Sequence, residues 1–562
     1  MTHSGFEIEQ MKKLLTDWRF AWFLLLLPVA LFLPAVPIDE TRYLSVAWEM
    51  RYTGEALLLH LNGDPYTHKG PLLFWLINLA WTAAGLHVWI VRLGILVCSL
   101  ISLVLFERLV RRLDPDDAAG GGVLATRATQ IFAGMLFVAV FASLIMFDVL
   151  LATCVLLALH GIVDMDEKRW TRGIAVFALG LSLGMINKGP AMLLDACLVG
   201  VAAPWWSATA RNAPGRWYAA LLGGVAIAVA IGFAYMLLAG GWDFVNAVIF
   251  HQTAQRMTQS FAHARPLWWY FMVLPFMILP WTLALRAPWR VWRDSLAADK
   301  ASRFALVWFL PAFAVFCLLS GKQTHYLLPL LPGLALYFAQ VLRAPQASVR
   351  GRLFGAALVL AGLVLAATPY LVAHAQSVPL LAKMAQSGSL SPTEQRVISG
   401  LWPLWGALIA LIGAFVLMHA RVRSEVRGMA FATVAAAVCG LLAIAQFAGP
   451  TVDVTATANR IRAAQEAGRP VAHLGWHHGL FEFPGRLTQP LQKLDLDTLY
   501  TWCAAHPDGE VITFYTKYGI PVKPELEVPY RLGRILIWRA SDLCAGPRPT
   551  GKAVEEDEMP ND

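Results

Sequence analysis

Long apolar segments separated by short polar ones set the hydropathy pattern of this chain. A membrane-crossing helix needs about 20 mostly apolar residues. About thirteen segments meet or approach that length; they lie near 18–36, 88–106, 129–147, 149–163, 173–187, 190–206, 217–239, 267–286, 304–320, 326–342, 353–374, 401–419 and 429–449. The segments 149–163 and 173–187 are short, so we expect them to tilt against partners or to enter the membrane partly. The pattern predicts a polytopic α-helical membrane protein.

Composition agrees with this class. The chain has 57% hydrophobic and 15% charged residues over its 562 positions, which is more apolar than a soluble globular domain. The first apolar segment is long, lacks a small-residue cleavage site and precedes many similar segments, so we expect a retained helix and not a signal peptide.

Basic residues occupy alternate loops of the predicted topology. The positive-inside rule places these loops, and the N-terminus, on the cytoplasmic side of the membrane. The bias accounts for most of the net charge of +8, so no nucleic-acid partner is needed. The basic groups are Lys12, Lys13 and Arg19; Arg108, Arg111 and Arg112; Lys168, Arg169 and Arg172; Arg286, Arg290, Arg293 and Arg303; Arg343, Arg350 and Arg352; and Arg421, Arg423 and Arg427.

The composition shifts after the last apolar segment. Residues 1–450 form the predicted membrane domain, with a first outer loop at 37–87, and residues 451–562 hold a predicted helix (456–467) and short apolar strands (470–474, 510–515 and 534–538). We expect a small extracytoplasmic α/β domain with a disordered acidic tail. On that side of the membrane Cys503 and Cys544 could form a disulfide.

The first outer loop carries the densest set of polar residues. Residues 38–75 read IDETRYLSVAWEMRYTGEALLLHLNGDPYTHKGPLLFW. This run resembles the first extracytoplasmic loop of the GT-C glycosyltransferases that include protein O-mannosyltransferases and bacterial aminoarabinose (ArnT-like) transferases, where the pattern is DE-x-RY, EM, NG-x-P-Y and KPPL-x-x-W. It departs from the pattern at Gly70, where the family usually has a proline, and at His68, where an acidic residue is common.

The resemblance implies roles for several loop residues. Asp39 would be the essential carboxylate that orients or deprotonates the acceptor, with Arg42 and Tyr43 shaping the same pocket. Tyr66 and Lys69 would bind the donor phosphate after a turn at Asn62-Gly63. The alternatives are that Asp39 caps the following helix and that Lys69 extends along the membrane interface; the role of Glu40 is left open.

Two further outer segments match the same family. Asp148, in MFDVLLAT, corresponds to a family carboxylate at the outer end of a span, the alternative being a helix cap. The segment SGKQTHYLLP contributes Lys322 and Tyr326, with interfacial anchoring as the alternative. Lys188, in the segment NKGP, could add positive charge or mark the interface.

The outer segment 251–270 reads HQTAQRMTQSFAHARPLWWY. Arg256 in it is a candidate for binding the donor phosphate. His263 and His68 are candidate ligands of a divalent metal ion, the one cofactor that the residues suggest.

The resemblance implies an inverting, polyprenyl-phosphate-sugar-dependent glycosyltransferase. Its partners would be an undecaprenyl-phosphate sugar donor, with 4-amino-4-deoxy-L-arabinose as the specific sugar, a lipid A acceptor, and membrane lipids. Another glycan or a protein is the alternative acceptor. A polytopic transporter or flippase is the runner-up class, disfavoured because the polar residues collect at one face and the sequence shows no internal repeat. A non-catalytic lipid-binding scaffold is the third class, and it predicts that Asp39 could be changed without loss.

Overall fold

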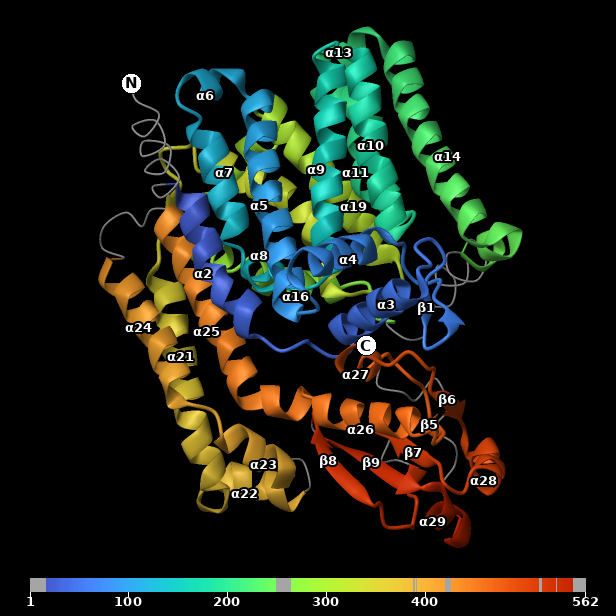
Figure 1. The fold of residues 1–562 in the computed structure, drawn as a ribbon. Coiled ribbons are helices and arrows are strands. Elements are labelled where there is room, and N and C mark those ends of the chain that lie inside the picture. Colours follow the sequence, from blue (N-terminus) through green and yellow to red (C-terminus); the bar gives the residue numbers. More distant parts are fainter. Residues whose placement is uncertain are drawn as a thin grey trace, which may run out of the picture.

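The computed structural model describes residues 17–248, 264–387, 390, 392–419, 426–514, 518–531 and 533–548. The described chain is a helical bundle with a smaller mixed α/β unit at one end (Figure 1). Each of the thirteen apolar segments of the sequence overlaps at least one helix. Six helical stretches are long and apolar enough to cross a membrane by themselves: Val88–Leu113, Phe147–Asp166, Pro214–Asn246, Lys300–Leu318, Arg352–Ala373 and Val426–Glu466. The protein is therefore a multi-pass membrane protein, whereas the number of crossings stays a prediction.

Several apolar segments form broken helices. The segment 129–147 is divided between α7 and α8 by an interruption at Gly134-Met135, and the segment 267–286 is divided between α16 and α17, with prolines at 275 and 280. Pro275 lies inside α16, whereas Pro280 is the N-cap of α17, where its missing amide hydrogen breaks no helical hydrogen bond. The bundle helices are α2 (Trp18–Phe32), α5 (Val88–Leu113), α6 (Pro115–Ala119), α7 (Val123–Ala133), α8 (Leu136–Phe141), α9 (Phe147–Asp166), α10 (Trp170–Lys188), α11 (Ala191–Val201), α12 (Ala203–Trp206), α13 (Ala208–Asn212), α14 (Pro214–Asn246), α16 (Trp269–Met277), α17 (Trp281–Ala284), α18 (Trp289–Ser295), α19 (Lys300–Leu318), η2 (Thr324–Leu330), α20 (Leu331–Val341), α21 (Arg352–Ala373), α24 (Pro403–His419) and α25 (Val426–Val452).

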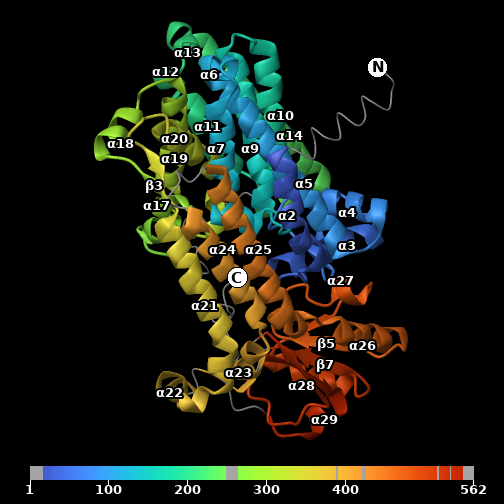
Figure 2. The ribbon, with the colours of Figure 1, turned by 90° about the vertical axis from the view of Figure 1, so that its left-hand side faces the viewer.

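The long apolar helices differ in how deeply they are buried in the bundle. Helix α9 is the most buried of the long apolar helices, and α21 and α14 are the least buried. Figures 1 and 2 show α21 and α24 as a hairpin on one flank of the bundle and α14 as a long helix on the other. Residues beyond the hairpin's outer end form η3 (Ala375–Ser377), α22 (Pro379–Gln386) and α23 (Pro392–Ser399).

Glycines permit the close approach of α21 and α24. A Cβ added to Gly362 would lie 2.4 Å from the Ala410 nitrogen, and one added to Gly406 would lie 2.3 Å from the Ala366 nitrogen. Small residues let membrane helices approach closely, because lipid gives no hydrophobic drive for their association.

The first outer loop is ordered by two helices and a hairpin. It comprises α3 (Asp39–Thr53), β1 (His60–Leu61), β2 (Asp64–Pro65) and α4 (Leu72–Ala84). The predicted turn at Asn62-Gly63 is confirmed, since both residues have positive φ, 57° and 84°, between two antiparallel strands. These angles suit a two-residue hairpin turn.

The C-terminal unit contains a five-stranded sheet in the order β6-β5-β7-β9-β8. Strand β5 pairs parallel with β6 and with β7, and β9 pairs antiparallel with both β7 and β8. The predicted helix 456–467 is α26, and the three predicted strands are β5, β7 and β9. The elements are α26 (Thr455–Glu466), β5 (Val471–Leu474), α27 (Glu482–Gly485), β6 (Gln492–Leu494), α28 (Leu496–Ala505), β7 (Glu510–Thr513), β8 (Leu526–Tyr530), β9 (Gly533–Arg539) and α29 (Ala540–Ala545).

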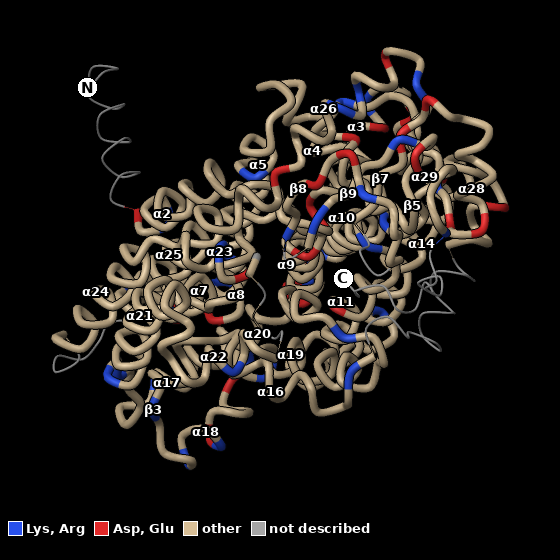
Figure 3. The backbone as a smooth tube through the Cα atoms, turned by 90° about the horizontal axis from the view of Figure 1, so that it is seen from below, with Lys and Arg blue, Asp and Glu red and all other residues tan. Residues whose placement is uncertain are grey.

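A short two-stranded ribbon joins the segment after α17 to the segment before α21. Strands β3 (Leu285–Arg286) and β4 (Ser348–Val349) pair antiparallel there. Figure 3 looks at the molecule from the sheet end; charged residues gather over the sheet and α3, whereas α21, α24 and α25 carry few. Charged residues are therefore concentrated at the end of the molecule that holds the sheet and α3, whereas α21, α24 and α25 have the apolar surface expected of lipid-facing helices.

Candidate active site

Asp39 is the first residue of α3, at the point where the chain leaves α2. Its Oδ1 accepts a hydrogen bond of 2.9 Å from the hydroxyl of Tyr43, one helical turn further on. The N-cap position belongs to Ile38, and no side chain caps this helix. The alternative interpretation of Asp39 as a helix cap is therefore wrong, and its carboxylate is oriented by Tyr43.

Glu40, whose role the sequence left open, is buried against Arg92 of α5. The two side chains are 2% and 0% exposed and form an ion pair. The carboxylate also accepts hydrogen bonds from the backbone amides of Val36 and Ile145, each at 2.7 Å, and Arg92 donates to the carbonyl of Pro34 at 2.7 Å. A buried ion pair is tolerated when its remaining hydrogen-bonding capacity is satisfied. This network joins the link before Asp39 to the turn before α9.

Asp148 lies in the first turn of α9 and is 2% exposed. Its Oδ1 forms an ion pair with the ammonium of Lys188, the last residue of α10. Its Oδ2 lies 3.7 Å from Nε2 of His325. Met146 holds the N-cap position, so Asp148 does not cap the helix either. The carboxylate instead fixes Lys188 and His325 beside each other.

Lys188 also faces Tyr326. Its Nζ lies 4.3 Å from the centroid of the Tyr326 ring, a distance at which the ring's negative face attracts a cation. The electrostatic interactions of His325 extend to Asp148, Lys188, Lys69 and Asp39. We call Asp39, Asp148, Lys69, Lys188 and His325 the charged cluster.

A cavity of about 190 Å³ adjoins the charged cluster. Lys69 and Lys188 line one part of it, and the long helix α14 contributes an aromatic and aliphatic wall. The ammonium of Lys69 lies 5.7 Å from the ring centroid of Phe147, which precedes Asp148. The complete lining is Thr67, His68, Lys69, Gly70, Met185, Lys188, Gly189, Pro190, Gly232, Tyr235, Met236, Phe244 and Val248. The cavity thus joins two cationic side chains to apolar surface.

Gly70 brings Lys69 and Lys188 together. Its amide donates to the carbonyl of Asn187 at 3.3 Å, and a Cβ at position 70 would lie 1.8 Å from the carbonyl oxygen of Ile186. Proline has no amide hydrogen to make this bond. The departure from the family pattern at Gly70 therefore coincides with a direct backbone contact between the first loop and α10.

The other predicted binding residues lie around the charged cluster. Tyr66 is 4% exposed, with its ring 5.3 Å from His68 and 6.1 Å from Phe74. The Arg42 guanidinium lies 5.9 Å from the ring of Trp476 in the C-terminal unit. Tyr66 thus packs among aromatic residues of the first loop, and Arg42 faces the C-terminal unit.

Lys322 is buried and turned toward the backbone. Its Nζ donates to the carbonyl of Arg265 at 2.9 Å and to that of Leu319. These bonds hold the segment that follows α19 against the residues before α16, where Ala264 and Gly321 also form a β-bridge. The geometry supports an anchoring role for Lys322.

Arg256 and His263 lie outside the described residues. Within the described ranges, no group of three or more His, Cys, Asp or Glu side chains could hold a metal ion. His68 packs against Tyr66. The metal site formed by His68 and His263 therefore stays a prediction.

The C-terminal unit docks on α3. Ser45 donates to the carbonyl of Gly479 at 2.7 Å, and the indole of Trp48 donates to the carbonyl of Leu487 at 2.7 Å. The rings of Trp81 and Phe483 stack with centroids 4.8 Å apart. The same helix that begins with Asp39 thus supports the C-terminal unit along its length.

A buried acid and base sit at this interface. Nε2 of His477 lies 3.2 Å from Oε1 of Glu482. Burial raises the pKa of Glu482 to about 7 and lowers the pKa of His477 to about 3. Desolvation disfavours the charged form of each group. The pair is therefore mostly uncharged below neutral pH.

Sequence reasoning missed Arg92, His325 and Asp195. Arg92 stands near the start of an apolar helix, where it looks like an interfacial residue. His325 lies in the quoted SGKQTHYLLP segment but was given no role. Asp195 is a fully buried carboxylate of α11 that interacts electrostatically with Lys188 and Asp148. The sequence did contain a signal for Asp195. A charged residue inside an apolar membrane segment is energetically costly, so its presence there indicates a functional role.

No protein-family model matches the chain. It is 30% identical over 373 residues to the undecaprenyl phosphate-alpha-4-amino-4-deoxy-L-arabinose arabinosyl transferase of Pseudomonas paraeruginosa, covering 63% of this chain and 66% of that protein. It is 29% identical over 359 residues to arabinosyl transferase 1 of the same name in Pseudomonas fluorescens, covering 60% of this chain and 62% of that protein. The alignments thus span a little under two thirds of these relatives' own length.

Solved structures agree over nearly the whole fold. ArnT from Cupriavidus metallidurans bound to undecaprenyl phosphate matches with a TM-score of 0.71, 17% identity, and coverage of 97% of this chain and 100% of that chain. The apo state of that protein gives a TM-score of 0.72 at 17% identity, with 94% and 98% coverage. The fold is that of a GT-C membrane protein. In sequence and in fold the chain is thus similar to ArnT-like GT-C proteins.

Proposed function

We propose that this protein is an inverting glycosyltransferase that moves a sugar from an undecaprenyl-phosphate carrier to an acceptor of the cell envelope. The specific sugar is 4-amino-4-deoxy-L-arabinose and the specific acceptor is lipid A. The names of the sequence relatives support the donor, and the resemblance of the first loop supports the acceptor.

One observation carries the proposal. Lys69 and Lys188 line the same cavity, beside apolar residues of α14, and both act electrostatically on the cluster that contains Asp39. An anionic phosphate attached to a long hydrocarbon needs this combination, since cations stabilise the phosphate and apolar surface receives the chain. The carboxylate held by Tyr43 then stands ready for the acceptor.

The chemistry is a single displacement at the anomeric carbon. An acceptor oxygen forms the new bond while the bond from that carbon to the lipid phosphate oxygen breaks, and the phosphate leaves with the electron pair. Lys69 and Lys188 stabilise the charge that develops on the departing phosphate. Asp39 orients the acceptor oxygen or takes its proton when it has one. Asp148 acts through Lys188 and His325 as a positioning residue.

The proposal includes an orientation of the protein in the membrane. The N-terminus is cytoplasmic, and the charged cluster and the C-terminal unit face the periplasm of the inner membrane. The bias of Lys and Arg toward one set of loops supports this. Alkaline phosphatase fused after Arg548 should be active in intact cells, and the same reporter fused after Lys168 should be inactive. The reverse pattern would contradict the orientation.

The test of activity is mass spectrometry of lipid A from a strain that lacks aminoarabinose transferase. The strain would express the intact protein, Asp39→Asn or Glu55→Gln at matched membrane levels. Glu55 is an exposed carboxylate of the same loop that pairs with His60, so its variant controls for loss of a loop charge. We expect the aminoarabinose mass with the intact protein and Glu55→Gln, and its loss with Asp39→Asn.

Two outcomes would contradict parts of the proposal. An unchanged mass with Asp39→Asn would remove Asp39 from catalysis. No added mass with the intact protein would reject this sugar and acceptor pair, and comparison of envelope glycans and proteins from the same cells would then identify the alternative acceptor.

A further inference from the structure

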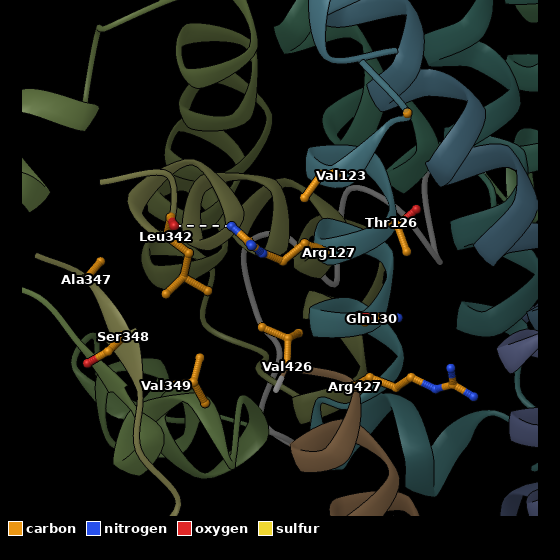
Figure 4. Close-up of a pocket in the computed structure, with 11 residues that line it drawn as sticks. Val123, Thr126, Arg127, Gln130, Leu342, Ala347, Ser348, Val349, Val426 and Arg427 are labelled. Carbon is orange, nitrogen blue, oxygen red and sulfur yellow. Dashed lines mark hydrogen bonds between the residues drawn. The ribbon is translucent and has the colours of Figure 1, made fainter. Parts of the chain in front are cut away.

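A second and larger cavity lies at the other end of the bundle. Helix α5 runs from the end that holds the charged cluster to the opposite end, and α7 begins there at Val123. The cavity has a volume of about 520 Å³ and lies among the first turns of α7, the end of α20, the β4 strand and the start of α25 (Figure 4). It is separate from the cavity that Lys69 and Lys188 line.

The lining of this cavity is cationic and polar. Arg127 and Arg427 line it together with Thr126, Gln130 and Ser348, and no Asp or Glu is among its described lining residues. In Figure 4 the side chain of Arg127 extends from α7 toward Leu342, and its Nη1 donates to the Leu342 carbonyl at 3.1 Å. A guanidinium has five N–H donors, so this bond leaves further donors of Arg127 available to an anion.

Arg427 contributes charge at the edge. It is exposed, its guanidinium lies 5.8 Å from the ring of Phe431, and it interacts with Asp17, which also pairs with Arg19. Its side chain points away from the centre of the cavity in Figure 4. Arg127 is therefore the central cation of the site.

The surroundings indicate a lipid and not only a soluble anion. Val123 lines the cavity and is 54% exposed, and Leu353, at the start of the lipid-facing helix α21, is also 54% exposed. On the wall formed by the ribbon, Ser348 pairs with Arg286, and Arg350 follows β4; both arginines are exposed. Apolar surface beside a basic pocket between membrane helices is typical of sites for anionic lipid headgroups.

We propose that this cavity binds the phosphate of an anionic phospholipid through Arg127. The phosphodiester accepts hydrogen bonds from the guanidinium, Gln130 and Ser348 border the headgroup, and the acyl chains follow the exposed apolar residues. The ligand chemistry is that of a phosphate anion, and the membrane phospholipid is its source. The site requires a membrane protein but does not require the proposed transferase reaction.

Native mass spectrometry of the full-length purified protein tests the site. Delipidated protein would be titrated with phosphatidylglycerol, phosphatidylethanolamine or inorganic phosphate. The variants are Arg127→Gln, Arg127→Lys and Arg290→Gln, the last being an exposed arginine at the same end outside the cavity lining. Size-exclusion profiles would verify that each variant is folded.

We expect a one-to-one phosphatidylglycerol adduct that is weakened about fivefold in Arg127→Gln, the factor that corresponds to one basic contact with an anionic lipid. Arg127→Lys should bind within about twofold of the intact protein, because it keeps the charge, and Arg290→Gln should bind like it. Equal binding of both phospholipids, or an unchanged titration of Arg127→Gln, would overturn the proposal. Displacement of the lipid by millimolar inorganic phosphate would overturn the lipid as the source.

Discussion

The guanidinium of Arg92 and the carboxylate of Glu40 form a fully buried ion pair next to Asp39. The pair joins α5 to the start of α3, and Glu40 also holds the backbone at Val36 and Ile145. Asp39 is thus placed by its neighbour in sequence, through contacts that reach three other parts of the chain.

Removing only Arg92 should be more damaging than removing the pair. Arg92→Leu leaves the Glu40 carboxylate buried without its cation, and breaking one partner of a buried ion pair costs about 3–5 kcal/mol. In Glu40→Gln/Arg92→Leu no charge is left buried, so we expect a higher thermal unfolding midpoint than in Arg92→Leu. Melting of the purified proteins in one detergent measures this; a double variant that melts below the single one would contradict the account.

Substitution of Gly70 should disturb the cavity that Lys69 and Lys188 line. Gly70→Ala puts a Cβ against the backbone carbonyl of Ile186, which must move and carry Lys188 with it. We expect transfer activity to fall by about tenfold or more, because a misplacement near 1 Å can cost a hundredfold in rate. Gly94→Ala is the matched control, since a Cβ there meets nothing within 4 Å. Equal activity of both variants would remove the backbone contact from the site.

Lys69 should affect donor use. Lys69→Ala removes a cation from the cavity, so we expect a higher KM for the lipid-phosphate sugar together with a lower kcat, while Lys69→Arg should recover part of both. A transfer assay with varied donor concentration measures the two constants. Full activity of Lys69→Ala would remove Lys69 from donor binding.

The C-terminal unit should be less stable in acid. Burial lowers the pKa of His473 and His477 to about 3 and that of His478 to about 2, from an ordinary value of 6.5. The unfolded chain therefore binds more protons at these sites than the folded chain does. The free energy of unfolding consequently falls as the pH drops below 6.5. Glu482 acts in the opposite direction, because its raised pKa gives stability below its ordinary value of 4.5 that is lost as the pH rises through about 7.

Three histidines outweigh one carboxyl group between pH 5 and 6.5, so stability should fall with acidification over this range. Glu482→Gln removes the compensating proton uptake, and we expect a steeper fall of the unfolding midpoint in that variant. Midpoints measured at several pH values provide the test. A shallower fall in Glu482→Gln would mean that the pair titrates in the reverse sense.

Cys503 and Cys544 should form a disulfide if the C-terminal unit is periplasmic. Their side chains lie within hydrogen-bonding reach of each other, between α28 and α29. Thiol oxidation in that compartment would transfer two electrons to a disulfide-exchange oxidant and release two protons. Peptide mapping without reduction should find the 503–544 link, and Cys503→Ser should lower stability by about 2–4 kcal/mol. Two free thiols in protein from intact envelopes would contradict both the link and the periplasmic location.

Much of the fold could be predicted from local sequence. An apolar run determines by itself whether a segment favours the membrane, so each of the thirteen segments overlaps at least one helix. The Asn62-Gly63 hairpin turn was also a local property, since both residues tolerate positive φ. Broken helices such as α16 and α17 were less evident, because their apolar runs continue through the prolines.

The candidate site was only partly readable from the sequence. Its polar residues stood out at one membrane face, and the family pattern singled out Asp39 and Lys69. Whether these side chains meet depends on contacts between distant segments: Glu40 with Arg92, Asp148 with Lys188, and Gly70 with the backbone of α10. Hydropathy is additive along a segment, so it can be calculated from the sequence alone. The pairing of charges and the close approach of backbones arise only when the helices pack, so the tertiary structure alone decided them.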